Sequence, residues 1–176
     1  WQAQGLLLDL SITISMRDLQ GIATAAAYAA AVRARGADPR RLVLELTESD
    51  VEPASPALDV LARLRQKGFG LAVDDYGTGL SSLEQFSALP FTELKIDRGF
   101  VANCDRDARR RGVVESALAL SRKLNLRSVA EGVQTREEWN VLRDAGCACA
   151  QGWLIAKAMP AGEFVAWAAA HRAKAG

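Results

Sequence analysis

Short apolar runs alternate with helix-forming segments along the whole 176-residue chain, and this alternation limits the fold more than any other feature. Each run is bounded by turn residues and is too short for a buried helix, which indicates a buried strand. Strands that alternate with helices usually pair in parallel. The expected strands are residues 6–14, 42–47, 69–74, 91–97, 126–131 and 147–152. The sequence therefore predicts an α/β protein with about six βα units.

The segments between these runs carry recognisable helix signals. Ser15 is expected to cap a helix that runs to about residue 35, and Thr135 with Glu138 forms a capping box. The remaining helices are expected over residues 56–67, 107–124 and 161–172, with a short one capped by Ser81. Arg109, Arg110 and Arg111 are interpreted as a solvated first turn.

Two parallel architectures fit this pattern. A doubly wound open sheet needs about this length, whereas a (β/α)₈ barrel typically needs about 250 residues, so a barrel would lack two units. Polar groups at nearly every strand end favour the barrel, because an open sheet concentrates its site at one switch point. The pattern alone leaves both open.

Charged and amide side chains stand where the apolar runs end. They are Glu45, Asp74, Asp75, Lys95, Asp97, Glu131 and Gln151. Burying such groups is costly unless they are paired or bind a ligand, so strands ending together predict one site at one end of the sheet. For any single residue, a helix cap or an ion pair with an arginine is an equally good interpretation.

The donor types limit the metal. The chain has one histidine, His171 in the last expected helix, which excludes a histidine-rich zinc or iron site. Oxygen ligands favour Mg²⁺, Mn²⁺ or Ca²⁺. Two adjacent carboxylates with two distant ones are typical of a two-ion site that activates water for displacement at phosphorus, with Lys95 offsetting phosphate charge.

Composition excludes other functions. A net charge of +1 provides no field for a nucleic-acid polymer or a membrane surface. No apolar run could span a bilayer, and Cys104, Cys147 and Cys149 suit a reducing cytoplasm as core residues rather than metal ligands. The first residue is Trp1, so we expect a fragment or processed product whose parent could be tethered to a membrane.

Five segments, in order, resemble motifs of the EAL domain family of bacterial cyclic di-GMP phosphodiesterases. They read LELTESD, VDDYGTGLSSL, LKIDRGFV, AEGVQT and AQGWLIAKAMP. The resemblance implies a (β/α)₈-type, TIM-like barrel with one antiparallel strand. It also implies hydrolysis of cyclic di-GMP to linear pGpG with two Mg²⁺ or Mn²⁺ ions.

The resemblance also implies roles for individual residues. Glu45, Asp74 and Glu131 resemble metal ligands, and Asp75 lies beside them in the second ion's site. Lys95 resembles the lysine that contacts the catalytic water, and Gln151 the glutamine near it. Glu48 resembles the residue that anchors the DYGTG loop, which in the family links substrate binding to dimerisation.

The chain departs from the family pattern in several places. The Glu-Ala-Leu signature is absent, so residues 1–176 are expected to form a single partial EAL domain that lacks one metal ligand and roughly two strands. Thr13 stands where the family usually has a metal-binding Asn. Gln134 replaces a Glu, and Leu80 replaces a Tyr.

We therefore expect the intact parent to be a phosphodiesterase and this chain alone to be inactive. The alternative is a degenerate EAL-like receptor for cyclic di-GMP, or an interaction domain, that does not hydrolyse it. A lyase using Lys95 as a Schiff base is disfavoured, because four carboxylates would keep the amine protonated. Expected partners are a second copy, other EAL or GGDEF domains, or sensory domains of the parent.

Overall fold

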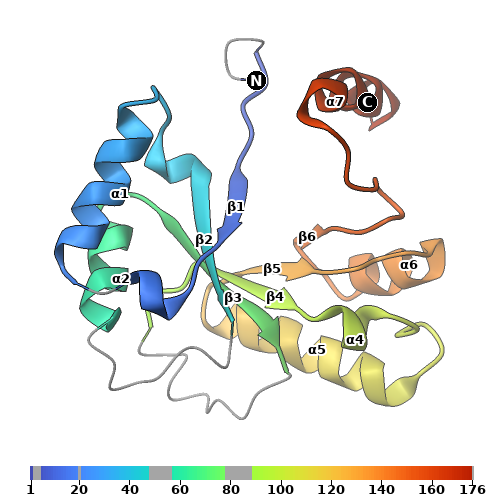
Figure 1. Cartoon of the computed structure of the whole chain (residues 1–176). Helices are drawn as coiled ribbons and strands as arrows, with labels where there is room; N and C mark the ends of the chain where they lie inside the picture. Colours follow the sequence, from blue (N-terminus) through green and yellow to red (C-terminus); the bar gives the residue numbers. More distant parts are fainter. Residues whose placement is uncertain (2–4, 20, 48–56, 78–88, 176) are drawn as a thin grey trace.

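All six strands form one parallel sheet in sequence order (Figure 1). The computed structural model describes residues 1, 5–19, 21–47, 57–77 and 89–175. The strands are β1 (Leu10–Thr13), β2 (Leu42–Thr47), β3 (Gly70–Tyr76), β4 (Glu93–Ile96), β5 (Arg127–Ala130) and β6 (Cys149–Ala150). Each lies within a predicted run except β3, which continues two residues beyond its run. The α/β prediction is confirmed.

Helices between successive strands cover the convex face of the sheet, and one further helix follows the last strand. They are α1 (Ala23–Arg33), α2 (Ala57–Gln66), α4 (Arg98–Val101), α5 (Ala108–Lys123), α6 (Arg136–Asp144) and α7 (Ala161–Ala175), with short 3₁₀ turns at Met16–Leu19 and Pro39–Arg41. Figure 1 shows α1 and α2 on one flank of the sheet, and α5 and α6 on the other. The expected helix after Ser81 lies outside the described residues.

Two local predictions need correction. Ser15 accepts a hydrogen bond from the Arg17 amide at 3.1 Å, but it starts a 3₁₀ turn rather than α1, which begins at Ala23. The arginines at the start of α5 are not simply solvated. Arg110 and Arg111 donate to the Ala102 carbonyl at 2.7 Å and the Cys104 carbonyl at 3.0 Å, and so hold the connection between α4 and α5.

The sheet is an incomplete barrel, with β1 at one end of the strand order and β6 at the other. Its inner strands are well covered: all four residues of β4 are buried. In contrast, all four residues of β1 are exposed. The three cysteines are free, as expected for a chain without a disulfide framework. No helix among the described residues is long and apolar enough to cross a membrane.

The apolar core lies between the sheet and its helices. Leu94 and Ile96 of β4 belong to this core, together with Leu71 and Val73 of β3. Successive side chains of a strand point to opposite faces, so Lys95 points to the concave face, away from the helices. Because the strands are parallel, their carboxyl ends bring polar side chains to one end of that face.

Candidate active site

The ammonium group of Lys95 is the centre of the site. Its Nζ lies 2.9 Å from Glu45 Oε2, 2.9 Å from Asp74 Oδ1 and 2.6 Å from Glu131 Oε1. Four strands or their ends therefore contribute to one cluster: β2, β3, β4 and the residue after β5. Only 5% of Lys95 is exposed. Three carboxylates compensate the cost of burying this cation.

The cluster keeps Lys95 charged. Burial acts to lower the pKa of Lys95, but hydrogen bonds from its ammonium to Glu131, Glu45 and Asp74 outweigh burial and raise the pKa above its ordinary value. A protonated lysine is a poor nucleophile, which argues against the Schiff-base lyase. The same ammonium is a strong hydrogen-bond donor toward water or an anion.

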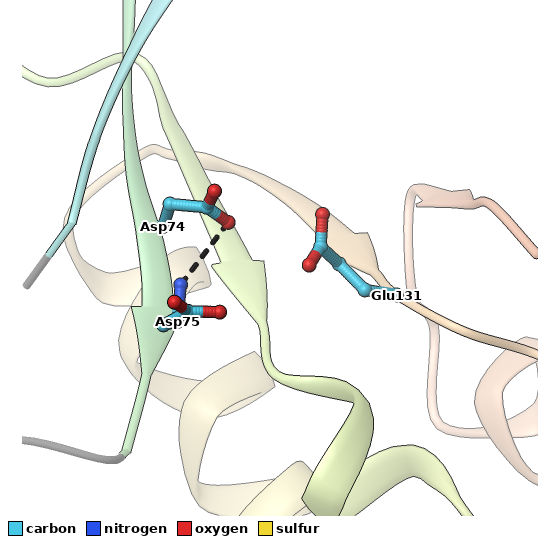
Figure 2. A group of neighbouring side chains, drawn as sticks. All are labelled: Asp74, Asp75 and Glu131. Carbon is cyan, nitrogen blue, oxygen red and sulfur yellow. Dashed lines mark hydrogen bonds between the residues drawn. The ribbon is translucent and has the colours of Figure 1, made fainter. Parts of the chain in front are cut away.

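An irregularity in β3 places two adjacent carboxylates on one side. In a regular strand, Asp74 and Asp75 would point to opposite faces. Here the register with β4 shifts between Val73 and Tyr76, and Asp75 has a φ of 56°. The Asp75 amide donates to Asp74 Oδ1 at 3.1 Å (Figure 2). This left-handed backbone is uncommon outside glycine and often occurs at functional sites.

Glu131 faces the aspartates from the loop after β5, as Figure 2 shows. Burial raises the pKa of Glu131; Lys95 acts to lower it, while Asp74 and Glu45 raise it further. Gln151, which follows β6, donates from Nε2 to Glu131 Oε1 at 2.7 Å. Gln151 thus fixes the carboxylate that also pairs with the lysine.

Three carboxylates meet the distance requirement for a shared cation. Oxygens of Asp74, Asp75 and Glu131 lie within 4.8 Å of one another. Burial raises the pKa of Asp75, and the neighbouring charges of Asp74 and Asp97 raise it further. A divalent cation relieves the repulsion between crowded carboxylates, and oxygen donors suit Mg²⁺, Mn²⁺ or Ca²⁺. These residues therefore fit the expected ions.

The remaining predicted site residues within the described part of the chain lie either in the cluster around Lys95 or at its edge, except Asp97. Glu45 joins the cluster through Lys95, and Thr13 pairs with Glu45 in the register of β1 and β2. Asp97 is the N-cap of α4, since its Oδ1 accepts from the Gly99 amide at 2.8 Å. That is the structural interpretation left open for strand-end carboxylates. Glu48 and Leu80 lie outside the described residues.

One exposed aromatic residue near the site was missed. Trp153 follows Gln151 by two residues and is 62% exposed, with Lys157 Nζ 5.3 Å from its ring centroid. The backbone just before Trp153 packs closely on a neighbouring loop, because a Cβ at Gly152 would collide with the Val133 carbonyl. A large aromatic side chain two residues after a site glutamine was the available signal in the sequence.

Comparison with known proteins agrees with this geometry. A family model described as the EAL domain matches residues 1–158. The chain is 42% identical over 130 residues to the bifunctional diguanylate cyclase/cyclic di-GMP phosphodiesterase MucR of Pseudomonas aeruginosa. That match covers 73% of this chain and 19% of MucR, so the chain spans about a fifth of this relative.

Solved structures show the same fold. The EAL domain of Mycobacterium smegmatis DcpA superposes with a TM-score of 0.87 at 33% identity, over 93% of this chain and 75% of that one. A manganese and cyclic di-GMP complex of Klebsiella pneumoniae BlrP1 gives a TM-score of 0.78 at 28% identity, over 85% of this chain and 38% of that one. The incomplete barrel is thus part of a TIM-like architecture.

Proposed function

This chain belongs to the EAL domain family, and from that premise we propose that the protein containing it hydrolyses cyclic di-GMP to linear pGpG. The observation that carries the proposal is the group of carboxylates from Glu45, Asp74 and Glu131 around the buried ammonium of Lys95. A binding module for a neutral ligand has no need for such a costly arrangement.

The proposed ligands for Mg²⁺ or Mn²⁺ are Asp74, Asp75 and Glu131. Glu45 of β2 and Thr13 of β1 are proposed to complete the ligand set. When bound, such ions supply an activated water and offset the charge that develops on the phosphate oxygens. The oxygens of the three nearest carboxylates already lie within 4.8 Å of one another. The protein therefore spends little conformational entropy on assembling them.

Lys95 and Gln151 orient the reaction. A permanently protonated Lys95 cannot act as a base, but its N–H groups can hold a water oxygen or a phosphate oxygen in place. Gln151 holds Glu131 through its 2.7 Å hydrogen bond and so limits the rotation of that carboxylate. Water adds to phosphorus and one ester P–O bond breaks, which leaves a phosphate on one ribose and a hydroxyl on the other.

Trp153 is the proposed platform for one guanine. An exposed indole beside the site offers a face on which a purine can stack, a contact worth about 1–3 kcal/mol per base. The side chain is 62% exposed, and a base that stacks on the face near Lys157 would displace the ammonium that lies 5.3 Å from the ring centroid. This contact would add affinity for the nucleotide without taking part in the displacement itself.

The six-stranded half-barrel alone is proposed to be inactive. The 176 residues contain no Glu-Ala-Leu sequence. The four residues of β1, which end at Thr13 beside the site, are all exposed. An edge strand of this kind offers unpaired backbone groups to another segment or to a second copy. We propose pairing of this edge, in a homodimer or with other domains of the parent, as a condition for activity.

A degenerate receptor is the second candidate, and Thr13 is the observation that favours it. A hydroxyl is a weaker neutral metal ligand than an amide oxygen, so a parent with Thr13 could bind the nucleotide without turning it over. Calorimetry with Ca²⁺ and cyclic di-GMP, together with an assay for pGpG, separates the two candidates.

The test uses the intact parent protein with Mn²⁺ and cyclic di-GMP, and pGpG is followed by chromatography. We expect turnover in the wild type and a loss of about 100-fold or more in Asp74→Asn and Asp75→Asn. Asp144→Asn, on the solvent side of α6, is the matched control and should leave the rate unchanged. Absence of pGpG at every metal concentration would reject hydrolysis and leave the receptor.

A further inference from the structure

We propose that Arg98 binds a phosphodiester oxygen of the substrate; this inference rests on the proposed function. Arg98 is the first residue of α4 and directly follows Asp97, two residues after Lys95. It therefore lies at the carboxyl end of β4, the end of the sheet where the carboxylates meet. Arg98 lies within the segment LKIDRGFV, whose resemblance to the family gives roles to Lys95 but none to this arginine.

The aliphatic part of Arg98 is held against the backbone that follows Glu131. A Cβ placed on Gly132 would meet the Arg98 Cγ, and it would lie 2.7 Å from Cδ and 2.8 Å from Cβ. Gly132 has a φ of +67°, so this position favours glycine for its backbone as well as for this contact. The Arg98 stem is thus fixed beside a proposed metal ligand.

The helix that carries Arg98 is braced on its other side. A Cβ on Gly77 would lie 2.7 Å from Cε2 of the Phe100 ring, so this ring packs on the backbone just after Asp75. The short helix α4 therefore packs against the backbone that follows β3 at Gly77 and the backbone that follows Glu131 at Gly132. Arg98 is presented from a supported element rather than from a free loop, which suits a residue that positions a ligand.

The guanidinium of Arg98 is exposed and forms no hydrogen bond or ion pair within the described part of the chain. The nearby acids are already engaged: Asp97 caps α4, and Glu131 binds both Lys95 and Gln151. By contrast, the guanidinium groups of Arg110 and Arg111 donate hydrogen bonds to backbone carbonyls. Within the part of the chain that the structure describes, the donors of Arg98 are therefore available to a ligand.

The substrate requires such a donor. The proposed site contains the carboxylates of Glu45, Asp74, Asp75 and Glu131 against a single ammonium, whereas each phosphodiester carries a negative charge. A planar guanidinium can donate two parallel hydrogen bonds to two phosphate oxygens. Arg98 thus supplies a further positively charged donor to the phosphate oxygens, beside Lys95 and the proposed metal ions.

The test compares Arg98→Met and Arg98→Lys in the intact parent protein. Methionine retains the packing on Gly132 but removes the donors, so the melting temperature should stay unchanged. We expect the KM for cyclic di-GMP to rise about 10-fold to 100-fold with kcat within about threefold, because the lost contact is present before and during the reaction. Lysine should restore part of the affinity. Arg143→Met, exposed on α6, is the control.

Salt dependence identifies the contacted group. For a phosphate contact, the KM of the wild type should rise with ionic strength more steeply than that of Arg98→Met. An unchanged KM in Arg98→Met overturns the inference. A raised KM with an unchanged salt dependence and no recovery by lysine also overturns it, because that result indicates a guanine contact.

Failure of the Arg98 contact can be distinguished from failure of the proposed hydrolysis. If the wild type binds cyclic di-GMP with Ca²⁺ in calorimetry but forms no pGpG, hydrolysis fails and the same variants are compared by Kd. A Kd raised in Arg98→Met then supports the inference, and an equal Kd rejects it. If the wild type neither binds nor hydrolyses the nucleotide, both proposals are rejected.

Discussion

Strands β4 and β1 each have four residues in one parallel sheet, yet their environments are opposite. In β4, ELKI, even Glu93 and Lys95 are buried. In β1, LSIT, the apolar Leu10 and Ile12 are 42% and 46% exposed. Both sequences alternate apolar and polar residues. Position in the sheet, rather than residue type, therefore decides what is buried, and the charged residues of β4 are tolerated because neighbouring strands supply partners.

The largest expected effect on stability and turnover comes from removing the buried ammonium of Lys95. Lys95→Met leaves Glu45, Asp74 and Glu131 without their shared partner, which should destabilise the fold by about 3–5 kcal/mol. Turnover should fall about 100-fold to 1000-fold. Denaturant unfolding and the pGpG assay measure both effects.

Adding Mn²⁺ to the same variant tests whether an ion can occupy the carboxylate cluster. A divalent ion can replace the missing positive charge, so Mn²⁺ should raise the melting temperature of Lys95→Met more than that of the wild type. Lys123→Met, exposed at the end of α5, serves as the control. Equal stabilisation of variant and wild type would show that the ion does not take over the charge of the missing ammonium.

The second prediction compares the two strands directly. Leu94 is fully buried, so Leu94→Ala should cost about 2–5 kcal/mol of unfolding free energy. Leu10→Ala should cost less than about 0.5 kcal/mol, because Leu10 already contacts solvent. Similar losses in urea unfolding would mean that β1 is covered in solution by a segment or partner.

The third prediction concerns Glu138, a buried carboxylate of α6 that, like Lys95, is satisfied by partners from elsewhere in the chain. This carboxylate accepts hydrogen bonds from the amides of Asn103 at 2.9 Å, Gln134 at 2.8 Å and Thr135 at 3.1 Å. Glu138→Gln places amide donors against these donors and should cost about 1.5–3 kcal/mol. Glu137→Gln, exposed in the same helical turn, is the control.

The Glu138 contribution should depend on pH. Burial acts to raise the pKa of Glu138, but the backbone hydrogen bonds outweigh burial and lower the pKa below its ordinary value of 4.5. The folded state therefore favours the ionised form, whose stabilisation is complete above pH 4.5 and is lost as the pH falls through the lowered value. The stability gap between wild type and Glu138→Gln should narrow below pH 4.5; a constant gap contradicts this.

The smallest expected effect lies at the exposed edge. Thr13→Asn introduces an amide oxygen beside Glu45 and should tighten Mn²⁺ binding by up to about tenfold, measured by calorimetry in the intact parent. Ser11→Asn, on the same face of β1, is the control. An unchanged Mn²⁺ affinity in Thr13→Asn would mean that the end of β1 contributes no metal ligand.

Much of this architecture was predictable from the sequence because it depends on local chemistry. Apolar runs predicted the strands, and the capping box of Thr135 and Glu138 is confirmed. The short helix α4 was missed because four residues carry too weak a periodic signal. Trp153 was missed because exposure is a property of the assembled fold. The contact of Glu138 with the Asn103 amide was missed because it joins residues 35 positions apart.

The sequence by itself determined the parallel α/β order and the residue types at the carboxyl ends of the strands, since strand and helix signals act over a few residues. Only the tertiary structure decided how those residues meet. The shifted register of β3 brings Asp75 to the same side as Asp74, and Lys95 gathers carboxylates from three other strand ends. Such geometry depends on packing between distant segments, which no local pattern specifies.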